Sequence, residues 1–187
     1  SYTDTDGSCK TCTPGRYSDV MMEIKGKECK QCPIGWYGKD LSLPKHQNRQ
    51  VLDSCDGCPG GRYGNRNGGS NVTEGCVFCI AGRFSNEEKQ VISAHLKTHE
   101  MCIACPAGKY SDVKGRTHEA MCKNCGSGKY SETKASNNIN KCLDCKPGRY
   151  LSSPGAGNED KCKLCPSSFS QVEQGSTSCI GCIPGKY

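Results

Sequence analysis

Cysteine is the residue type whose number and spacing point to chemistry in this chain. Of 187 residues 18 are cysteine, and all of them lie in nine Cys-x-x-Cys pairs, from Cys9 and Cys12 to Cys179 and Cys182. Paired thiols at this spacing form disulfides, bind zinc as thiolates or exchange electrons in thioredoxin-like folds. The redox use needs a βαβ pattern around the pair, and none surrounds these pairs. Disulfides and zinc remain as alternatives.

The second cysteine of each pair opens a motif that recurs along the whole chain. The reference copy is Cys105-Pro-Ala-Gly-Lys-Tyr-Ser111, and a departing, shortened copy is Cys165-Pro-Ser-Ser-Phe-Ser170, which lacks the glycine and the basic residue. Such self-similarity predicts a tandem repeat. We interpret the chain as one continuous array, with half repeats at its two ends, divided at residues 1–11, 12–31, 32–57, 58–78, 79–104, 105–124, 125–144, 145–164, 165–181 and 182–187.

The disulfide interpretation is the stronger of the two. Two pairs 16 or 17 residues apart fit a four-thiolate zinc site, but nine pairs do not divide evenly into two-pair sites. Cysteine at this density is typical of disulfide scaffolds, which persist outside the cytosol. Asn71-Val72-Thr73 is also an N-glycosylation acceptor, which has meaning only in the secretory route. We predict an extracellular chain, secreted or on a cell surface, with a glycan at Asn71; an intracellular zinc array is an alternative.

The composition limits the fold class. Only 34% of the chain is hydrophobic, which is too little for a shared core, and no apolar run approaches the ~20 residues that cross a bilayer. We predict small disulfide-rich repeats in an elongated rod of short β-hairpins and loops, with little helix and no single hydrophobic core. In each repeat we expect the aromatic ring over a disulfide and the basic side chain in solvent. The one helix predicted begins at Asn86, with Val91, Ile92 and Leu96 on one side.

Two disulfide schemes respect the period of the repeats. In the block scheme Cys9 joins Cys29 and Cys12 joins Cys32, and so on in blocks. In the sequential scheme the second cysteine of each pair bonds the first of the next: Cys12–Cys29, Cys32–Cys55, Cys58–Cys76, Cys79–Cys102, Cys105–Cys122, Cys125–Cys142, Cys145–Cys162 and Cys165–Cys179. Nearly constant block spacings favour the first scheme, and the chain ends favour the second.

The two chain ends are complementary halves of one repeat. Joining Tyr187 to Ser1 would give a loop of 13 residues between Cys182 and Cys9, as long as the loop that Cys165 and Cys179 enclose. We expect either a window of a longer array or copies that continue one another head to tail, with Cys9 and Cys182 bonded to neighbouring units. This complementarity makes the sequential scheme our prediction.

The phrase Cys-Pro-x-Gly-Lys/Arg-Tyr-Ser, followed by a spacer and Cys-x-x-Cys, resembles the ephrin-receptor-like cysteine-rich repeat. It is also similar to the first loop of the cysteine-rich modules of tumour necrosis factor receptors. The resemblance covers essentially the whole chain and implies an extracellular module; in the receptor modules the loop is closed sequentially, which maps onto Cys105 and Cys122. Long arrays of such repeats also occur in surface and fibrous glycoproteins of protists, including flagellar hairs.

No residue pattern in the sequence indicates catalysis. We find no Ser/His/Asp order, phosphate-cradling loop or carboxylate dyad, so we expect no enzyme and no cofactor. The basic motif position forms a candidate stripe for acidic glycans: Arg16, Arg62, Arg83, Lys109, Lys129, Arg149 and Lys186. We predict a structural component of an extracellular fibre or filamentous appendage that binds copies of itself, not nucleic acid or membrane. The stalk or ligand-binding ectodomain of a cell-surface receptor is the alternative.

Overall fold

The computed structural model of this chain describes residues 2–3, 9–10, 12–18, 29–38, 55–86 and 101–185. Its strands are two or three residues long: β1 Tyr2–Thr3, β2 Cys9–Lys10, β3 Arg16–Tyr17, β4 Lys30–Gln31, β5 Trp36–Gly38, β6 Cys55–Gly57, β7 Arg62–Gly64, β8 Cys76–Phe78, β9 Arg83–Phe84, β10 Ile103–Ala104, β11 Lys109–Tyr110, β12 Lys123–Asn124, β13 Lys129–Tyr130, β14 Leu143–Asp144, β15 Arg149–Tyr150, β16 Lys163–Leu164, β17 Phe169–Ser170 and β18 Ile180–Gly181. Helical turns are α2 Val72–Gly75, η1 Glu119–Met121, η2 Ile139–Lys141 and η3 Glu159–Lys161.

Each repeat folds into one antiparallel hairpin. In the repeat that begins at Cys105, β11 follows the motif glycine and β12 lies inside the next Cys-x-x-Cys pair, with Lys109 opposite Asn124 and Tyr110 opposite Lys123. Equivalent pairs join β3 to β4, β5 to β6, β7 to β8, β9 to β10, β13 to β14, β15 to β16 and β17 to β18. A two-stranded hairpin is marginal in water by itself. The hairpins therefore depend on cross-links and on their neighbours.

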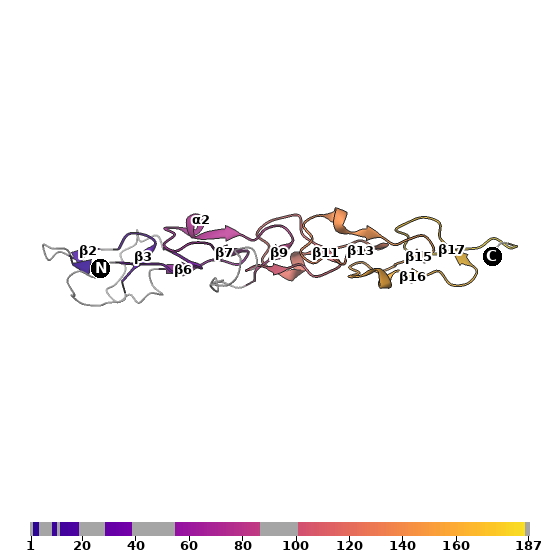
Figure 1. Cartoon of the computed structure of the whole chain (residues 1–187), viewed down its shortest axis with the longest axis horizontal. Helices are drawn as coiled ribbons and strands as arrows, with labels where there is room; N and C mark the ends of the chain where they lie inside the picture. Colours follow the sequence, from indigo (N-terminus) through magenta and orange to yellow (C-terminus); the bar gives the residue numbers. More distant parts are fainter. Residues whose placement is uncertain are drawn as a thin grey trace. The chain divides into compact units, whose positions relative to one another are not determined.

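The chain divides into two compact units. The first comprises Ser1–Cys79 with Ser85–Cys102, and the second comprises Ile80–Phe84 with Ile103–Tyr187. Within the second unit β11, β13, β15 and β17 follow one another in chain order (Figure 1). Buried side chains form small separate clusters, each built around half-cystines and at least one aromatic ring. Small disulfide-rich repeats with short hairpins and no single core were predicted, and this fold class is confirmed.

Helix is confined to short segments in the part of the chain that the structure describes. The α-helix α2 begins after Asn71, whose side chain accepts hydrogen bonds from the Thr73 and Glu74 amides. Sequence analysis did not predict α2, because four residues are too few to show a helical period. The helix that it predicted after Asn86, with Val91, Ile92 and Leu96, lies outside the described residues.

Candidate functional site

Eight disulfides cross-link the chain in the sequential scheme. They are Cys12–Cys29, Cys32–Cys55, Cys58–Cys76, Cys79–Cys102, Cys105–Cys122, Cys125–Cys142, Cys145–Cys162 and Cys165–Cys179. The Cα atoms of the joined residues lie 5.5 to 6.0 Å apart, within the usual range for a disulfide. Each bond closes the loop of one repeat, so the loop begins and ends at the same hairpin.

The disulfides decide what the cysteines are chemically able to do. A sulfur bonded to another sulfur is not a thiolate, and zinc requires thiolate ligands. Among the described residues there is no group of three or more His, Cys, Asp or Glu side chains that could hold a metal ion. The bonded sulfur atoms cross-link the loops of the repeats.

The glycine of the motif occupies a tight turn. In the Cys105 repeat the Lys109 amide donates to the Pro106 carbonyl over 3.1 Å, and Gly108 has φ of +80°. A type II turn needs positive φ at its third residue, and glycine adopts it without steric cost. The same turn recurs with Gly15, Gly35, Gly61, Gly82, Gly128, Gly148 and Gly185 at positive φ. Glycine here fixes the direction in which each hairpin leaves its first cysteine.

Five motif glycines also make both of their backbone hydrogen bonds across repeat boundaries: Gly61, Gly82, Gly108, Gly128 and Gly148. The Gly108 carbonyl accepts from the Cys125 amide over 2.8 Å, and the Gly108 amide donates to the Ser131 carbonyl, also over 2.8 Å. The equivalent donor and acceptor serve Gly82 and Gly128 in the same way. A buried backbone group requires such a partner. The turn of one repeat is thereby paired with the motif of the following one.

A second set of contacts joins the loop of a repeat to the cysteine that opens the repeat before it. The amides of Ala135, Gly155 and Gly175 donate to the carbonyls of Cys105, Cys125 and Cys145, respectively, over 2.8 to 2.9 Å. In the first unit the Gly68 amide donates to the Cys32 carbonyl over 2.8 Å. Each donor has positive φ and lies in the loop of its repeat. We call this segment the docking loop: Gly68–Gly69, Ala135–Ser136, Gly155–Ala156 and Gly175–Ser176.

The docking loop also pairs with the motif of the repeat immediately before its own. The Ser111 amide donates to the Ser136 carbonyl and the Ser131 amide to the Ala156 carbonyl, both over 3.0 Å. These contacts form parallel bridges between Tyr110 and Ser136 and between Tyr130 and Ala156. Sequence analysis missed the docking loop. Its signal is a pair of small residues that stands a few positions after the motif in each of these repeats.

In four motifs the aromatic residue packs on the disulfide of the following repeat. Tyr110 clusters with Cys125 and Cys142, and Phe84 clusters with Cys105 and Cys122. Tyr63 and Tyr130 make the same contact with the Cys79–Cys102 and Cys145–Cys162 bonds. Less than a tenth of each of these four rings is exposed. The predicted contact between ring and disulfide is present, and it joins neighbouring repeats instead of stabilising one repeat internally.

The basic side chains of the motif are engaged locally. Arg16, Arg62 and Arg149 each donate from Nη1 to the carbonyl of the cysteine that closes their own loop, over 2.9 to 3.3 Å. Lys109 and Lys129 instead form ion pairs, with Glu119 at 2.9 Å and with Asp144 at 2.6 Å. Most of these side chains are half-buried. The basic side chains thus remain in part exposed to solvent, as predicted, and in addition contact a carbonyl or carboxylate of their own repeat.

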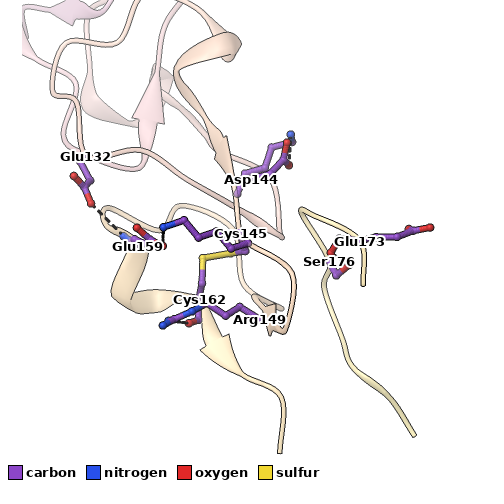
Figure 2. The surroundings of a disulfide bond; sticks show 10 residues. Glu132, Asp144, Cys145, Arg149, Glu159, Cys162, Glu173 and Ser176 are labelled. Atoms are coloured by element: carbon purple, nitrogen blue, oxygen red, sulfur yellow. Dashed lines mark hydrogen bonds and ion pairs between the residues drawn. A yellow bond between two sulfur atoms is a disulfide. The ribbon is translucent and has the colours of Figure 1, made fainter. Parts of the chain in front are cut away.

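Figure 2 shows the surroundings of the Cys145–Cys162 disulfide, where polar contacts of this kind lie close together. Arg149 lies against Cys162, and the Glu159 amide donates to the Glu132 carboxylate of the preceding repeat over 3.4 Å. Lys146 pairs with Glu159 at 2.8 Å, and this hydrogen bond lowers the pKa of the Glu159 carboxyl and raises the pKa of Lys146. Both groups lie at the surface, so they orient η3 without forming a reactive site.

Three further predicted site residues occupy different surroundings. Asn71 is exposed and caps α2. Cys182 is the one free cysteine among the described residues and is half-buried; its amide donates to the Ser168 carbonyl over 2.8 Å, as other motif cysteines donate to a glycine. The side chain of Cys9 lies outside the described residues. Lys186, at the basic motif position, lies outside them too.

The comparisons with known proteins agree with this arrangement. Residues 93–142 match the family model described as tyrosine-protein kinase ephrin type A/B receptor-like. The chain is thus similar, over these residues, to an ephrin-receptor-like cysteine-rich repeat, as the motif predicted. Such repeats are non-catalytic, and disulfide-rich arrays of them are typical of extracellular domains. No curated protein matches the chain.

Within the residues that the structure places, no helix is long and apolar enough to span a bilayer.

Proposed function

We propose that this chain is a structural component of an extracellular fibre or filamentous appendage, built by repeats that bind one another head to tail. The observation that carries the proposal is a recurring pair of contacts: a motif hydrogen-bonds to the docking loop of the next repeat, and its glycine lies against the docking loop of the repeat after that. Because donor, acceptor and glycine recur at fixed positions, the same contact can be made by any number of repeats in succession. Arrays of this kind gain stability from nearest-neighbour interfaces and not from a shared core.

The partner in this proposal is another copy of the chain or a continuation of it. Cys182 already has the backbone contact of a loop-opening cysteine, and its thiol is free for a bond to a neighbouring unit. Cys9 is the matching partner that the sequence offers. Acidic glycans are a second kind of partner, although most of the motif's basic groups already have local partners.

Self-association of the purified, oxidised chain tests the proposal. We expect linear oligomers that grow with concentration in sedimentation velocity and negative-stain microscopy, and a covalent ladder on non-reducing gels that dithiothreitol collapses. Cys182→Ser should abolish the ladder while leaving the eight internal disulfides in place. A chain that stays monomeric at every concentration, with Cys182 open to alkylation, would contradict the fibre.

The stalk or ectodomain of a cell-surface receptor is the second candidate, and the family match favours it, since the matching model is described as ephrin-receptor-like. The two candidates differ in what the array binds. A receptor module should remain monomeric and hold a separate ligand, whereas a fibre subunit should bind itself. The same sedimentation experiment, repeated with secreted proteins from the native source, therefore separates them.

Glycosylation at Asn71 is a prediction that the cap geometry supports. Asn71 Oδ1 accepts three hydrogen bonds, from the Thr73 hydroxyl at 2.6 Å and from the Thr73 and Glu74 amides. The cap therefore uses the oxygen, and a glycan attached to Nδ2 would displace only the 3.2 Å contact to Ser70. We expect native material to lose mass on treatment with an amidase that releases N-glycans.

Asn71→Asp is the matched control, because aspartate keeps a capping oxygen and removes the acceptor nitrogen. This variant should migrate like the enzyme-treated protein and keep its stability within about 0.5 kcal/mol, since only the cap decides the local fold. Native Asn71 that is unmodified in secreted material would refute the prediction.

A further inference from the structure

The motif glycine has a second role besides its turn: it leaves room for the docking loop two repeats on. A Cβ built on Gly82, Gly108 or Gly128 would approach the carbonyl oxygen of Ala135, Gly155 or Gly175 to less than 3.0 Å, a separation that real Cβ atoms do not show. In the first unit Gly15 stands in the same relation to Gly68. We call this position, a motif glycine at positive φ beneath a docking loop, the glycine socket.

The Cys165 repeat has the backbone of a socket and not its glycine. The Phe169 amide donates to the Pro166 carbonyl over 3.0 Å, and the residue between, Ser168, has φ of +67°. Phe169 pairs with Gly181 just as Arg149 pairs with Leu164, and the Ser168 carbonyl accepts from the Cys182 amide. The motif of this repeat is thus full-length, not the shortened copy that the sequence suggested, although its disulfide loop is three residues shorter than that of the preceding repeat. Only the Cβ distinguishes its turn from the others.

The same repeat also lacks the ring that packs on the next disulfide. Its register puts Phe169 at the position of the basic residue and Ser170 at the position of the tyrosine. Ser170 is exposed, and Phe169 is 48% exposed, whereas Tyr130 at the aromatic position is 7% exposed. Both contacts that run forward along the array, the ring and the socket, are therefore changed in one repeat.

We propose that Ser168 closes the glycine socket and makes the Cys165 repeat a joint at which the two-repeat contact stops. A docking loop approaching Ser168 would meet the serine Cβ where other repeats have open space. A carbonyl cannot occupy that space without moving the turn or the loop. Contacts with the immediately following repeat, such as the backbone bond between Ser168 and Cys182, do not need the open space, so only the contact across two repeats is lost and the array should bend more easily at this repeat. The inference rests on contact geometry and does not depend on the fibre.

An extended chain tests it. Residues 111–164 appended after Tyr187 would supply two docking loops, Ala135–Ser136 in register with residue 168 and Gly155–Ala156 in register with Gly185. Gly185 has φ of +88° and no atom within 4 Å of a built Cβ, so its socket is open in both the parent and its variants. The second appended loop is therefore the internal control for folding.

Hydrogen exchange of the first appended loop is the decisive readout. With Ser168 its amides should exchange as fast as those of an undocked loop; with Ser168→Gly they should exchange at least about tenfold more slowly, the protection expected of a docked backbone amide. Ser168→Ala should behave like serine, since it keeps the Cβ and removes only the hydroxyl. Equal protection in the serine and glycine chains, with the second loop protected in both, would overturn the proposal, as would an alanine chain that behaves like glycine.

Discussion

Gly108→Ala should lower the local free energy of unfolding of its repeat and the docking loop above it by about 3 kcal/mol. Roughly 1 to 2 kcal/mol comes from forcing alanine to positive φ, and a further 1 to 3 kcal/mol from the clash of its Cβ with the Gly155 carbonyl. Protection of the Gly155 amide, which donates to Cys125, should fall accordingly. Exchange at that amide, followed by mass spectrometry, measures the effect.

Gly148→Ala is the matched control for this experiment. Gly148 occupies the same turn at φ of +78°, but a Cβ there meets no atom within 4 Å. This variant should lose only the stability that the strained backbone costs, about 1 to 2 kcal/mol. Equal losses at the two glycines would mean that the turn alone matters and that the docking loop contributes nothing.

The double variant Cys125→Ala, Cys142→Ala should cost more than the loss of a cross-link. Opening a loop of this length removes about 3 kcal/mol by relieving the constraint on the unfolded chain. The Tyr110 ring packs on these sulfurs in a buried cluster, and deleting them adds a cavity worth roughly 1 to 3 kcal/mol. We expect a total near 5 kcal/mol, measured as the shift in urea-induced exposure of the Cys125 repeat.

The Cys165–Cys179 pair provides the comparison. Its sequence separation of 14 is close to the 17 of Cys125–Cys142, so the entropic contributions nearly match. Both of its residues are only half-buried. Its double alanine variant should therefore lose about 3 kcal/mol. If the two variants lose the same stability, the contact between the Tyr110 ring and the disulfide contributes nothing to stability.

The spacing of the cysteines predicted the repeats and their cross-links, and the geometry of the hairpins explains why. A hairpin whose second strand lies inside a Cys-x-x-Cys pair brings Cys122 within bonding distance of Cys105, and the period along the chain repeats that geometry. The period alone does not separate the sequential from the block scheme, because both preserve it; only the complementary chain ends favoured the sequential scheme. The choice depends on which cysteine the two-residue strands place side by side, and strands so short leave no hydrophobic pattern.

The contacts between repeats were harder to foresee. The motif predicted an aromatic ring over a disulfide, but ring and sulfur belong to different repeats, as Tyr110 and Cys125 do. Docking on the preceding repeat uses backbone groups, which every residue has, and its only trace in the sequence is a pair of small residues such as Gly155 and Ala156. The sequence likewise carries no signal that the Arg149 side chain donates to the Cys162 carbonyl.

The loop-closing disulfides also set how the chain bears tension. In the Cys105 repeat the cross-link spans 5.9 Å between Cα atoms and bypasses 17 residues of sequence. A pulling force passes through the sulfur bridge and the short Cys-x-x-Cys segments, and the loop itself carries none of it. Seventeen residues drawn straight would reach about 60 Å, so each bond withholds about 50 Å of slack while it is intact. Reduction of the disulfides would therefore convert a nearly inextensible chain into one that lengthens stepwise under tension, repeat by repeat.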